Sequence, residues 1–346
     1  MNLKFKAFLL VFKHPFGVSS NTRNETPTVF IKLTEGEHCG YGEACLPVYL
    51  GETREETIIF FRKAHTVLAK ISAPLNLTEI LNTIDDLSQV NNAAKAAIDM
   101  ALHDLVGKMR AQTIAQMYGF AGAEPMSTSY TIGIDTEVKL IQKINDASDF
   151  SVLKIKAGTE NDQALISFIR KHTDKPLYVD VNQGWKDKVF ALDMILWMTT
   201  QNVVLIEQPL PVAMRDEMAW VTSQSLIPTI ADESVKRFKD LQDLKGVFSG
   251  VNIKLMKCTG LAEAIKMIDF CKENKLLVFL GCMAESSCGT SAMAQLIGFA
   301  DYIDLDAPLL YKNDPFSGVA YEKGKVILNK QPGIGAAPKA NFLNTW

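Results

Sequence analysis

The sequence has no apolar segment that approaches the ~20 consecutive residues of a membrane-spanning helix. Near its start, the apolar run AFLLVF (7–12) is shorter than the core of a secretory signal peptide. Lysine and proline follow this run, where a signal peptide has small residues. We therefore expect the run to form a strand, and we expect no membrane partner.

Cysteine is sparse, and charge of one sign does not accumulate. The six cysteines form no C-x-x-C pair and lack the density of a disulfide scaffold, so a reducing, cytoplasmic location is expected. The 36 basic and 39 acidic residues leave a net charge of −3 with no long run of one sign. This balance argues against nucleic-acid binding, and the expected partner is a small molecule.

A repeated pattern begins at about residue 127. Eight apolar, β-rich runs alternate with amphipathic segments such as KVFALDMILWMTT (188–200). Parallel strands that are buried on both faces have this pattern, and eight βα units indicate an α/β fold with a (β/α)8 TIM-type barrel over residues 127–316. The predicted strands are residues 129–134, 152–157, 176–181, 203–208, 227–232, 250–255, 276–281 and 301–306.

Residues 1–126 have a different pattern, with strand-like LKFKAFLLVF (3–12) and TPTVFIKLTEG (26–36) before a helical stretch at 91–109. This order predicts a separate α+β domain. Residues 317–346 contain short strand-like runs and glycine turns, and we expect them to pack back onto that domain.

Three carboxylates fall at the ends of consecutive predicted strands: Asp180, Glu207 and Asp232. The carboxyl ends of barrel strands form the active-site face, so we expect these side chains to converge. Converging carboxylates require a cation or raised pKa values, and oxygen ligands without nearby histidine or cysteine favour Mg²⁺ over Zn²⁺. A single aspartate at a strand end is often only a helix cap, so the prediction depends on all three together. The neighbouring Asn182 and Glu233 are expected to cap helices or face solvent.

Lysines flank these carboxylates. Lys154 and Lys156 are two residues apart in VLKIKA (152–157), so both point into the barrel from one strand. Lys254 ends the sixth predicted strand and faces Lys156 across a ring of eight. One lysine can remove a proton from a bound substrate while the other returns one to the opposite face, and Lys154 adds positive charge beside the site. For any single lysine, the alternative is a head group that snorkels to the rim.

The K-x-K pair, the Asp–Glu–Asp series and the lysine of NIKLMK (252–257) resemble the enolase superfamily, muconate-lactonizing subgroup, over essentially the whole chain. The resemblance implies an α+β capping domain over a modified (β/α)7β barrel. It also implies Mg²⁺ bound by Asp180, Glu207 and Asp232. Lys156 and Lys254 then form an acid/base pair that acts beside the substrate carboxylate through an enolate.

Asp304 and Asp306 lie two residues apart in the last predicted strand, DYIDLD (301–306). A D-x-D at this position is similar to that of dipeptide epimerases, in which it binds the α-ammonium of the dipeptide. The alternative is a solvated acidic strand end. N-acyl substrates have no ammonium, so the pair favours a dipeptide over the substrates of N-acylamino acid racemases and o-succinylbenzoate synthases.

The segment PFGVSSNTRNETPTVFIKL (15–33) resembles the same region of L-Ala-D/L-Glu epimerases, with one departure. Their glutamate-binding arginine corresponds to Asn21 here. Arg23, in what reads as a polar loop, is the candidate replacement, and a solvated arginine is the alternative.

Together these features predict a Mg²⁺-dependent dipeptide epimerase that inverts the C-terminal α-carbon, with L-Ala-D/L-Glu as the substrate class. An N-acylamino acid racemase or o-succinylbenzoate synthase remains the nearest alternative. A Schiff-base aldolase with one activated lysine and a non-catalytic peptide-binding barrel also remain open. A homo-oligomer is compatible with the sequence.

Overall fold

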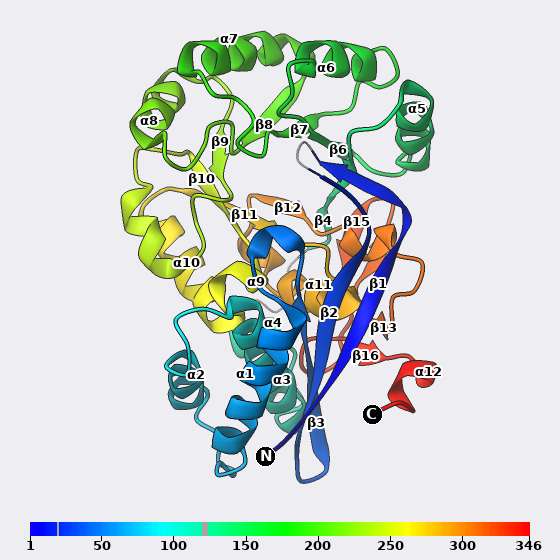
Figure 1. Ribbon diagram of the computed structural model, residues 1–346, viewed down its shortest axis with the longest axis vertical. Helices are drawn as coiled ribbons and strands as arrows, with labels where there is room; N and C mark the ends of the chain where they lie inside the picture. The colour runs from blue at the N-terminus through cyan, green and yellow to red at the C-terminus, as the bar shows by residue number, and fades with distance from the viewer. Residues whose placement is uncertain (19–20, 120–123) are drawn as a thin grey trace.

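The computed structural model describes residues 1–18, 21–119 and 124–346, and its centre is a ring of eight parallel strands (Figure 1). The strands follow one another around the ring in chain order, so the predicted TIM-type barrel is confirmed. Each lies within one of the eight predicted runs. They are β5 (Ser129–Ile132), β6 (Val152–Lys156), β7 (Leu177–Asp180), β8 (Val203–Glu207), β9 (Thr229–Ala231), β10 (Gly250–Ile253), β11 (Leu277–Gly281) and β12 (Tyr302–Asp304).

Side chains complete the ring where the last strand meets the first. In the part of the chain that the structure describes, no backbone ladder joins β12 to β5. Instead, Ser129 Oγ donates to Asp304 Oδ1 at 2.7 Å, and the backbone N–H of Leu305 donates to Thr128 Oγ1 at 2.8 Å. The closure therefore fixes Asp304 at the carboxyl end of β12.

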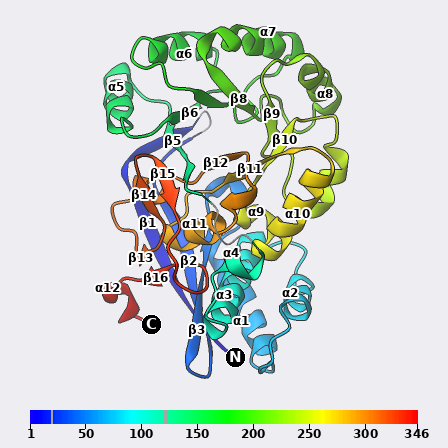
Figure 2. The ribbon, with the colours of Figure 1, turned by 180° about the vertical axis from the view of Figure 1, so that it is seen from behind.

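Helices cover the outside of the ring (Figure 2), but the crossover from β9 to β10 and the segment directly after the last barrel strand, β12, have only 3₁₀ turns. The turns η3 (Phe238–Asp243) and η5 (Ala307–Leu310) follow β9 and β12, which makes this the modified barrel that was expected. The other elements of the barrel are α5 (Glu137–Asp146), α6 (Asp162–Arg170), α7 (Lys188–Met198), η2 (Thr199–Gln201), α8 (Arg215–Gln224), α9 (Leu255–Cys258), α10 (Leu261–Glu273), α11 (Ser287–Ala294) and η4 (Ile297–Phe299).

An antiparallel sheet with helices forms the predicted α+β layer at one side of the barrel. Its strands are β1 (Asn2–Val18), β2 (Asn21–Glu35) and β3 (His38–Cys45), and its helical elements are η1 (Val48–Leu50), α1 (Arg54–Leu68), α2 (Leu77–Asp85), α3 (Asn92–Met109) and α4 (Ile114–Met117). Glycines let α3 approach β3 closely, because a Cβ atom at Gly40 would lie 1.9 Å from the carbonyl oxygen of Ala101. The long hairpin β1–β2 extends from this layer to the barrel (Figure 1).

The C-terminal segment lies beside this hairpin. Its elements are β13 (Phe316–Ser317), β14 (Ala320–Glu322), β15 (Lys325–Ile327), β16 (Ala337–Pro338) and α12 (Ala340–Leu343), and β15 pairs with β4 (Met126–Ser127). The ring of Phe342 packs against Phe8 and Phe30, with centroid distances of 5.5 and 5.4 Å. The domain boundaries at residues 126 and 316 stay a prediction. None of the described helices is both long and apolar enough to cross a membrane.

Two buried carboxyl groups meet where β3 contacts the loop after β11. Glu43 accepts hydrogen bonds from Ser286 N, Ser286 Oγ and Gly289 N, whereas Glu285 accepts one from Met283 N, and its Oε2 has no hydrogen-bond partner among the described residues. Burial, together with the charge of Glu285, raises the pKa of Glu43 to about 8. Burial likewise raises the pKa of Glu285 to about 7.

We expect Glu285→Gln to make the stability of the protein less dependent on pH. Because both pKa values lie above the usual 4.5, the folded chain holds protons that the unfolded chain releases. The resulting stabilisation is complete below about pH 4.5 and is lost as the pH rises through 7 and 8. Glutamine keeps the shape without ionising, so the melting temperature measured between pH 5 and 9 should fall less steeply. The exposed Glu322→Gln serves as the control, and a slope in Glu285→Gln equal to that of wild type would contradict the expectation.

Candidate active site

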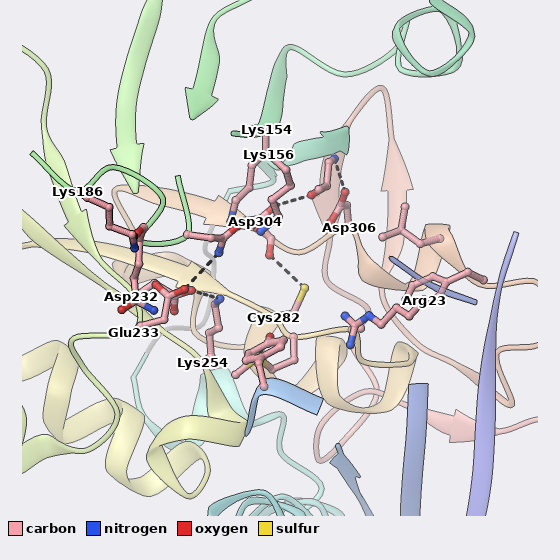
Figure 3. A pocket seen from close by; sticks show the side chains of 18 residues that line it. Arg23, Lys154, Lys156, Lys186, Asp232, Glu233, Lys254, Cys282, Asp304 and Asp306 are labelled. Atoms are coloured by element: carbon pink, nitrogen blue, oxygen red, sulfur yellow. Dashed lines mark hydrogen bonds and ion pairs between the residues drawn. The ribbon is translucent and has the colours of Figure 1, made fainter. Parts of the chain in front are cut away.

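A cavity of about 430 Å³ opens at the carboxyl ends of the barrel strands (Figure 3). Seven of the nine predicted site residues line it, and Asp180 and Glu207 lie fully buried behind its wall. The seven are Arg23, Lys154, Lys156, Asp232, Lys254, Asp304 and Asp306. The structure thus brings all the predicted residues to one place.

The three carboxylates at the ends of β7, β8 and β9 converge. The strand ladders pair Asp180 with Glu207, and Asp232 follows directly after β9. One oxygen atom of each carboxylate lies within 4.8 Å of the others, and all three side chains are buried. Three buried, hard oxygen donors without histidine or cysteine suit Mg²⁺.

Lys154 is a fully buried cation among these acids. Its Nζ lies 2.6 Å from Glu207 Oε2, 2.8 Å from Asp304 Oδ2 and 3.3 Å from Asp180 Oδ2. Burial alone would lower the pKa of Lys154, but the three carboxylates hold it well above its usual value. Lys154 therefore keeps its proton and supplies a permanent positive charge.

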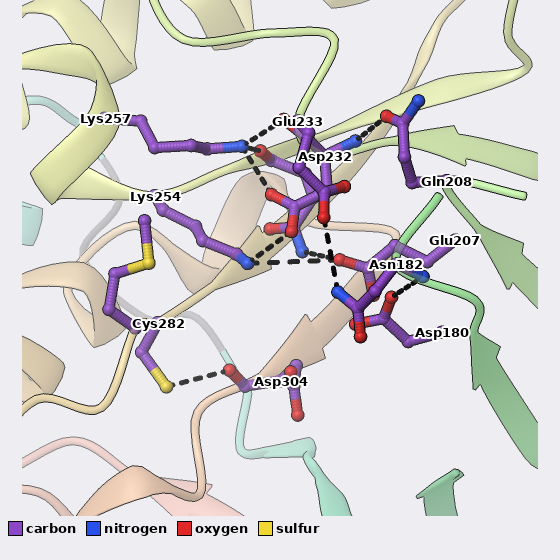
Figure 4. A network of polar contacts seen from close by, with 12 residues as sticks. Asp180, Asn182, Glu207, Gln208, Asp232, Glu233, Lys254, Lys257, Cys282 and Asp304 are labelled. Atoms are coloured by element: carbon purple, nitrogen blue, oxygen red, sulfur yellow. Dashed lines mark hydrogen bonds and ion pairs between the residues drawn. The ribbon is translucent and has the colours of Figure 1, made fainter. Parts of the chain in front are cut away.

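Lys156 and Lys254 reach the carboxylates from opposite parts of the ring. Lys156 Nζ lies 2.6 Å from Asp180 Oδ2. Lys254 Nζ lies 2.7 Å from Asp232 Oδ2 (Figure 4). Burial alone would lower the pKa of Lys254 and raise that of Asp232. Their contact reverses both effects, so the pKa of Lys254 lies well above its usual value and that of Asp232 lies well below. Lys257 lowers the pKa of Asp232 further. The two lysines thus stand on two sides of one carboxylate cluster.

Glu207 and Asp180 differ in their electrostatics although they are neighbours. Burial and the charge of Asp180 raise the pKa of Glu207 to about 7. Burial acts in the same direction on Asp180, but the ammonium groups of Lys156 and Lys154 lower its pKa below the usual value. Negative charge is therefore crowded at Glu207, where an added cation would be stabilising.

Asp304 and Asp306 both line the cavity, but only Asp304 belongs to β12. Asp306 lies two residues beyond it, just before η5, so the expectation that one strand carries both is wrong. Asp304 contacts Lys154 and Ser129. Burial alone would raise the pKa of Asp304, but the charge of Lys154 lowers it below the usual value. Asp306 Oδ2 accepts from Thr131 N at 2.6 Å, and burial with the charge of Asp304 raises the pKa of Asp306 to about 7. Of the two carboxylates, Asp304 already contacts a lysine.

Arg23 lies in strand β2 and not in the polar loop that was expected. Its Cζ is 5.5 Å from the ring centre of Phe12, and it lies on the side of the cavity away from Asp232 and Glu233 (Figure 3). The side chain of Asn21, at the position of the family's arginine, is outside the described residues.

Several groups that surround the carboxylates were not predicted from the sequence. Asn252 Nδ2 donates to Glu207 Oε1 at 2.7 Å, and Lys257 Nζ donates to Asp232 Oδ1 at 2.6 Å. Glu233, expected to cap a helix or face solvent, lines the cavity and accepts a hydrogen bond from Asn182 at 3.3 Å. The motif NIKLMK held no signal for Lys257, because Lys254 is still extended and the spacing of a helix does not relate the two lysines.

Comparison with known proteins agrees with this arrangement. Residues 6–119 match the family described as mandelate racemase / muconate lactonizing enzyme, N-terminal domain, and residues 136–341 match that described as enolase C-terminal domain-like. The chain is 45% identical over 336 residues to an L-Ala-D/L-Glu epimerase of Bacteroides thetaiotaomicron, covering 97% of this chain and 87% of that protein.

Two solved structures share the whole fold. A dipeptide epimerase of Enterococcus faecalis, complexed with Mg and the dipeptide L-Leu-L-Tyr, has a TM-score of 0.90 at 31% identity, covering 97% of this chain and 99% of that one. An N-succinyl Arg/Lys racemase of Bacillus cereus has a TM-score of 0.91 at 27% identity, covering 100% and 98%. By these matches over both of its parts, the chain belongs to the mandelate racemase / muconate lactonizing enzyme family of the enolase superfamily.

Proposed function

We propose that the protein is a Mg²⁺-dependent dipeptide epimerase that inverts the α-carbon of the C-terminal residue, with L-Ala-D/L-Glu as its substrate class. One observation carries the proposal: Lys156 and Lys254 lie on two sides of one carboxylate cluster, in a cavity that Asp306 also lines. The 45% identity to an L-Ala-D/L-Glu epimerase supports the substrate class.

Asp180, Glu207 and Asp232 would hold the Mg²⁺ ion, since they form a buried set of oxygen donors. When bound, Mg²⁺ would hold the substrate carboxylate, stabilise negative charge there, and offset the carboxylates that raise the pKa of Lys254. Asn252 would keep Glu207 in place through its hydrogen bond to Oε1.

Lys156 and Lys254 would carry out a 1,1-proton transfer. The lysine in its amine form takes the α-proton, which breaks the C–H bond on one face. The other lysine, in its ammonium form, gives a proton to the opposite face and forms the new C–H bond. Lys154 keeps its proton and adds positive charge behind the site.

Asp306 would bind the α-ammonium of the dipeptide. Asp304 already contacts Lys154 at 2.8 Å, whereas Asp306 lines the cavity, accepts from Thr131 N at 2.6 Å and forms no ion pair with a lysine of the described residues. Asp304 would then act mainly by holding Lys154. Arg23 would contact an acidic side chain of the C-terminal residue.

Asp306→Asn tests the ammonium contact. Losing one partner of a charge-assisted hydrogen bond removes roughly 1.5–3 kcal/mol, so kcat/KM for L-Ala-L-Glu should fall about tenfold to a hundredfold. N-acetylation of the dipeptide should cost wild type at least as much, and the two losses should not add because both break one contact.

The control for this test is the same N-acetylated substrate with the Asp306→Asn variant, in which little further loss is expected. Preference of the wild-type enzyme for the acetylated substrate would overturn the dipeptide assignment. It would favour an N-acylamino acid racemase, the activity type of the Bacillus cereus neighbour. A cytoplasmic location and a homo-oligomeric state stay predictions.

A further inference from the structure

Lys257 is a buried ammonium group that contacts Asp232 and Asn252. Its Nζ donates to Asp232 Oδ1 at 2.6 Å, to the Asp232 carbonyl oxygen at 2.7 Å and to the Asn252 carbonyl oxygen at 2.9 Å. Lys257 is 5% exposed and does not line the cavity, so a substrate has no access to it.

These contacts take the place of backbone pairing between β9 and β10, which stops after two residue pairs. β9 and β10 pair only at Gly250 with Ile230 and at Val251 with Ala231. The next residues in register are Asp232 and Asn252, and Lys257 joins their two carbonyl oxygens. The ammonium thus connects the strand ends just where Asp232 and Lys254 leave the sheet.

The same ammonium fixes the orientation of one carboxylate. Lys257 holds Oδ1 of Asp232, while Lys254 contacts Oδ2 from the cavity side (Figure 4). The two lysines are three residues apart, with Lys254 at the N-cap of the single turn α9 and Lys257 within it. The Asp232 N–H is held as well, by Gln208 Oε1 at 3.0 Å.

We propose that Lys257 is a positioning residue for the reaction. Through Asp232, Lys257 fixes Lys254, and it thereby supports proton transfer on the face of the substrate that Lys254 serves and not on the face that Lys156 serves. The inference rests on the proposed function. Lys156 depends on a different carboxylate, Asp180, and on a different strand, β6. Loss of Lys257 should therefore disturb proton transfer through Lys254 and leave transfer through Lys156 nearly unchanged.

The test compares α-proton exchange into D₂O from L-Ala-L-Glu and L-Ala-D-Glu, at initial rate and with saturating Mg²⁺. Lys254→Ala first identifies the epimer that exchanges through Lys254. In Lys257→Met, exchange from that epimer should fall about 10- to 100-fold, the usual effect of losing a group that orients a ligand. Exchange from the other epimer should change by less than about threefold.

Mg²⁺ binding measured by calorimetry gives a second readout. If Lys257 orients Asp232, Lys257→Met should weaken Mg²⁺ binding about tenfold. If it only balanced charge, its removal would relieve repulsion of the cation. Tighter Mg²⁺ binding with unchanged exchange from both epimers would therefore overturn the proposal.

Lys95→Met is the matched control, because Lys95 is also a buried ammonium, 3% exposed, with Asp85 Oδ1 at 2.7 Å. It should lower stability without changing the ratio of the two exchange rates. Equal losses from both epimers in Lys257→Met would refute this inference alone, whereas no exchange from either epimer in wild type would refute the proposed function.

Should Lys257→Met fail to fold, Lys257→Arg replaces it. The guanidinium keeps the charge but cannot present one nitrogen to three acceptors, so the same epimer-specific loss is expected at smaller size. Unchanged rates from both epimers in a folded Lys257→Arg would overturn the proposal.

Discussion

Lys254→Ala will abolish net epimerisation of L-Ala-L-Glu while the protein remains folded. The rate of epimerisation should fall by at least the roughly 10²–10⁴-fold that a general acid or base contributes, because inversion needs a proton donor on each face. Lys254 is the only lysine of the described part of the chain that contacts Asp232 from the cavity side. The substitution therefore removes the group that we propose as the proton donor for that face.

Isotope exchange separates this result from simple inactivation. Lys156 and its partner Asp180 are untouched by the change, so one epimer should still exchange its α-proton in D₂O without inverting. Lys266→Ala, an exposed lysine on α10, should behave as wild type. Normal conversion of both epimers by Lys254→Ala would show that the two-base mechanism is wrong.

Glu207→Gln is expected to weaken Mg²⁺ binding at least about 100-fold and to abolish turnover. This loss exceeds the usual effect of residues that only orient the metal ligands. The side chain is fully buried and accepts from Asn252, so the amide fits the space but loses the charge. Lys154 loses one of its three carboxylate contacts at the same time.

Calorimetric titration with Mg²⁺ and turnover assays together check this prediction. Glu273→Gln, at the exposed end of α10, is the control for an added neutral amide. Full activity of the wild-type enzyme in EDTA, or an unchanged Mg²⁺ affinity in Glu207→Gln, would contradict the proposal that activity depends on Mg²⁺ held by Glu207.

The barrel was predictable because its signal is local. Each strand is an apolar run between helical segments, and burial on both faces forces that composition. Period-two alternation likewise placed Lys154 and Lys156 on one side of β6, and strand ends placed the three carboxylates together. The roles of these residues stay proposals, since the geometry shows only that they meet.

The missed features depend on contacts between residues far apart in sequence. Asp306 leaves β12 because the strand ends at Asp304, whose side chain closes the ring through Ser129, 175 residues earlier. Lys257 bridges Asp232 and Asn252 only because the β9–β10 ladder is short. Strand length and side-chain reach of this kind have no signature in a single sequence.

The proposed activity requires that the protein moves the α-proton of the C-terminal residue of a dipeptide. The most direct measurement is proton NMR of L-Ala-L-Glu in D₂O with enzyme and Mg²⁺, because the alanine α-proton is an internal control in the same molecule. We expect the glutamate α-proton signal to disappear and L-Ala-D-Glu to appear, while the alanine α-proton signal persists. Retention of the glutamate α-proton by a folded, Mg²⁺-saturated enzyme would contradict the proposed activity.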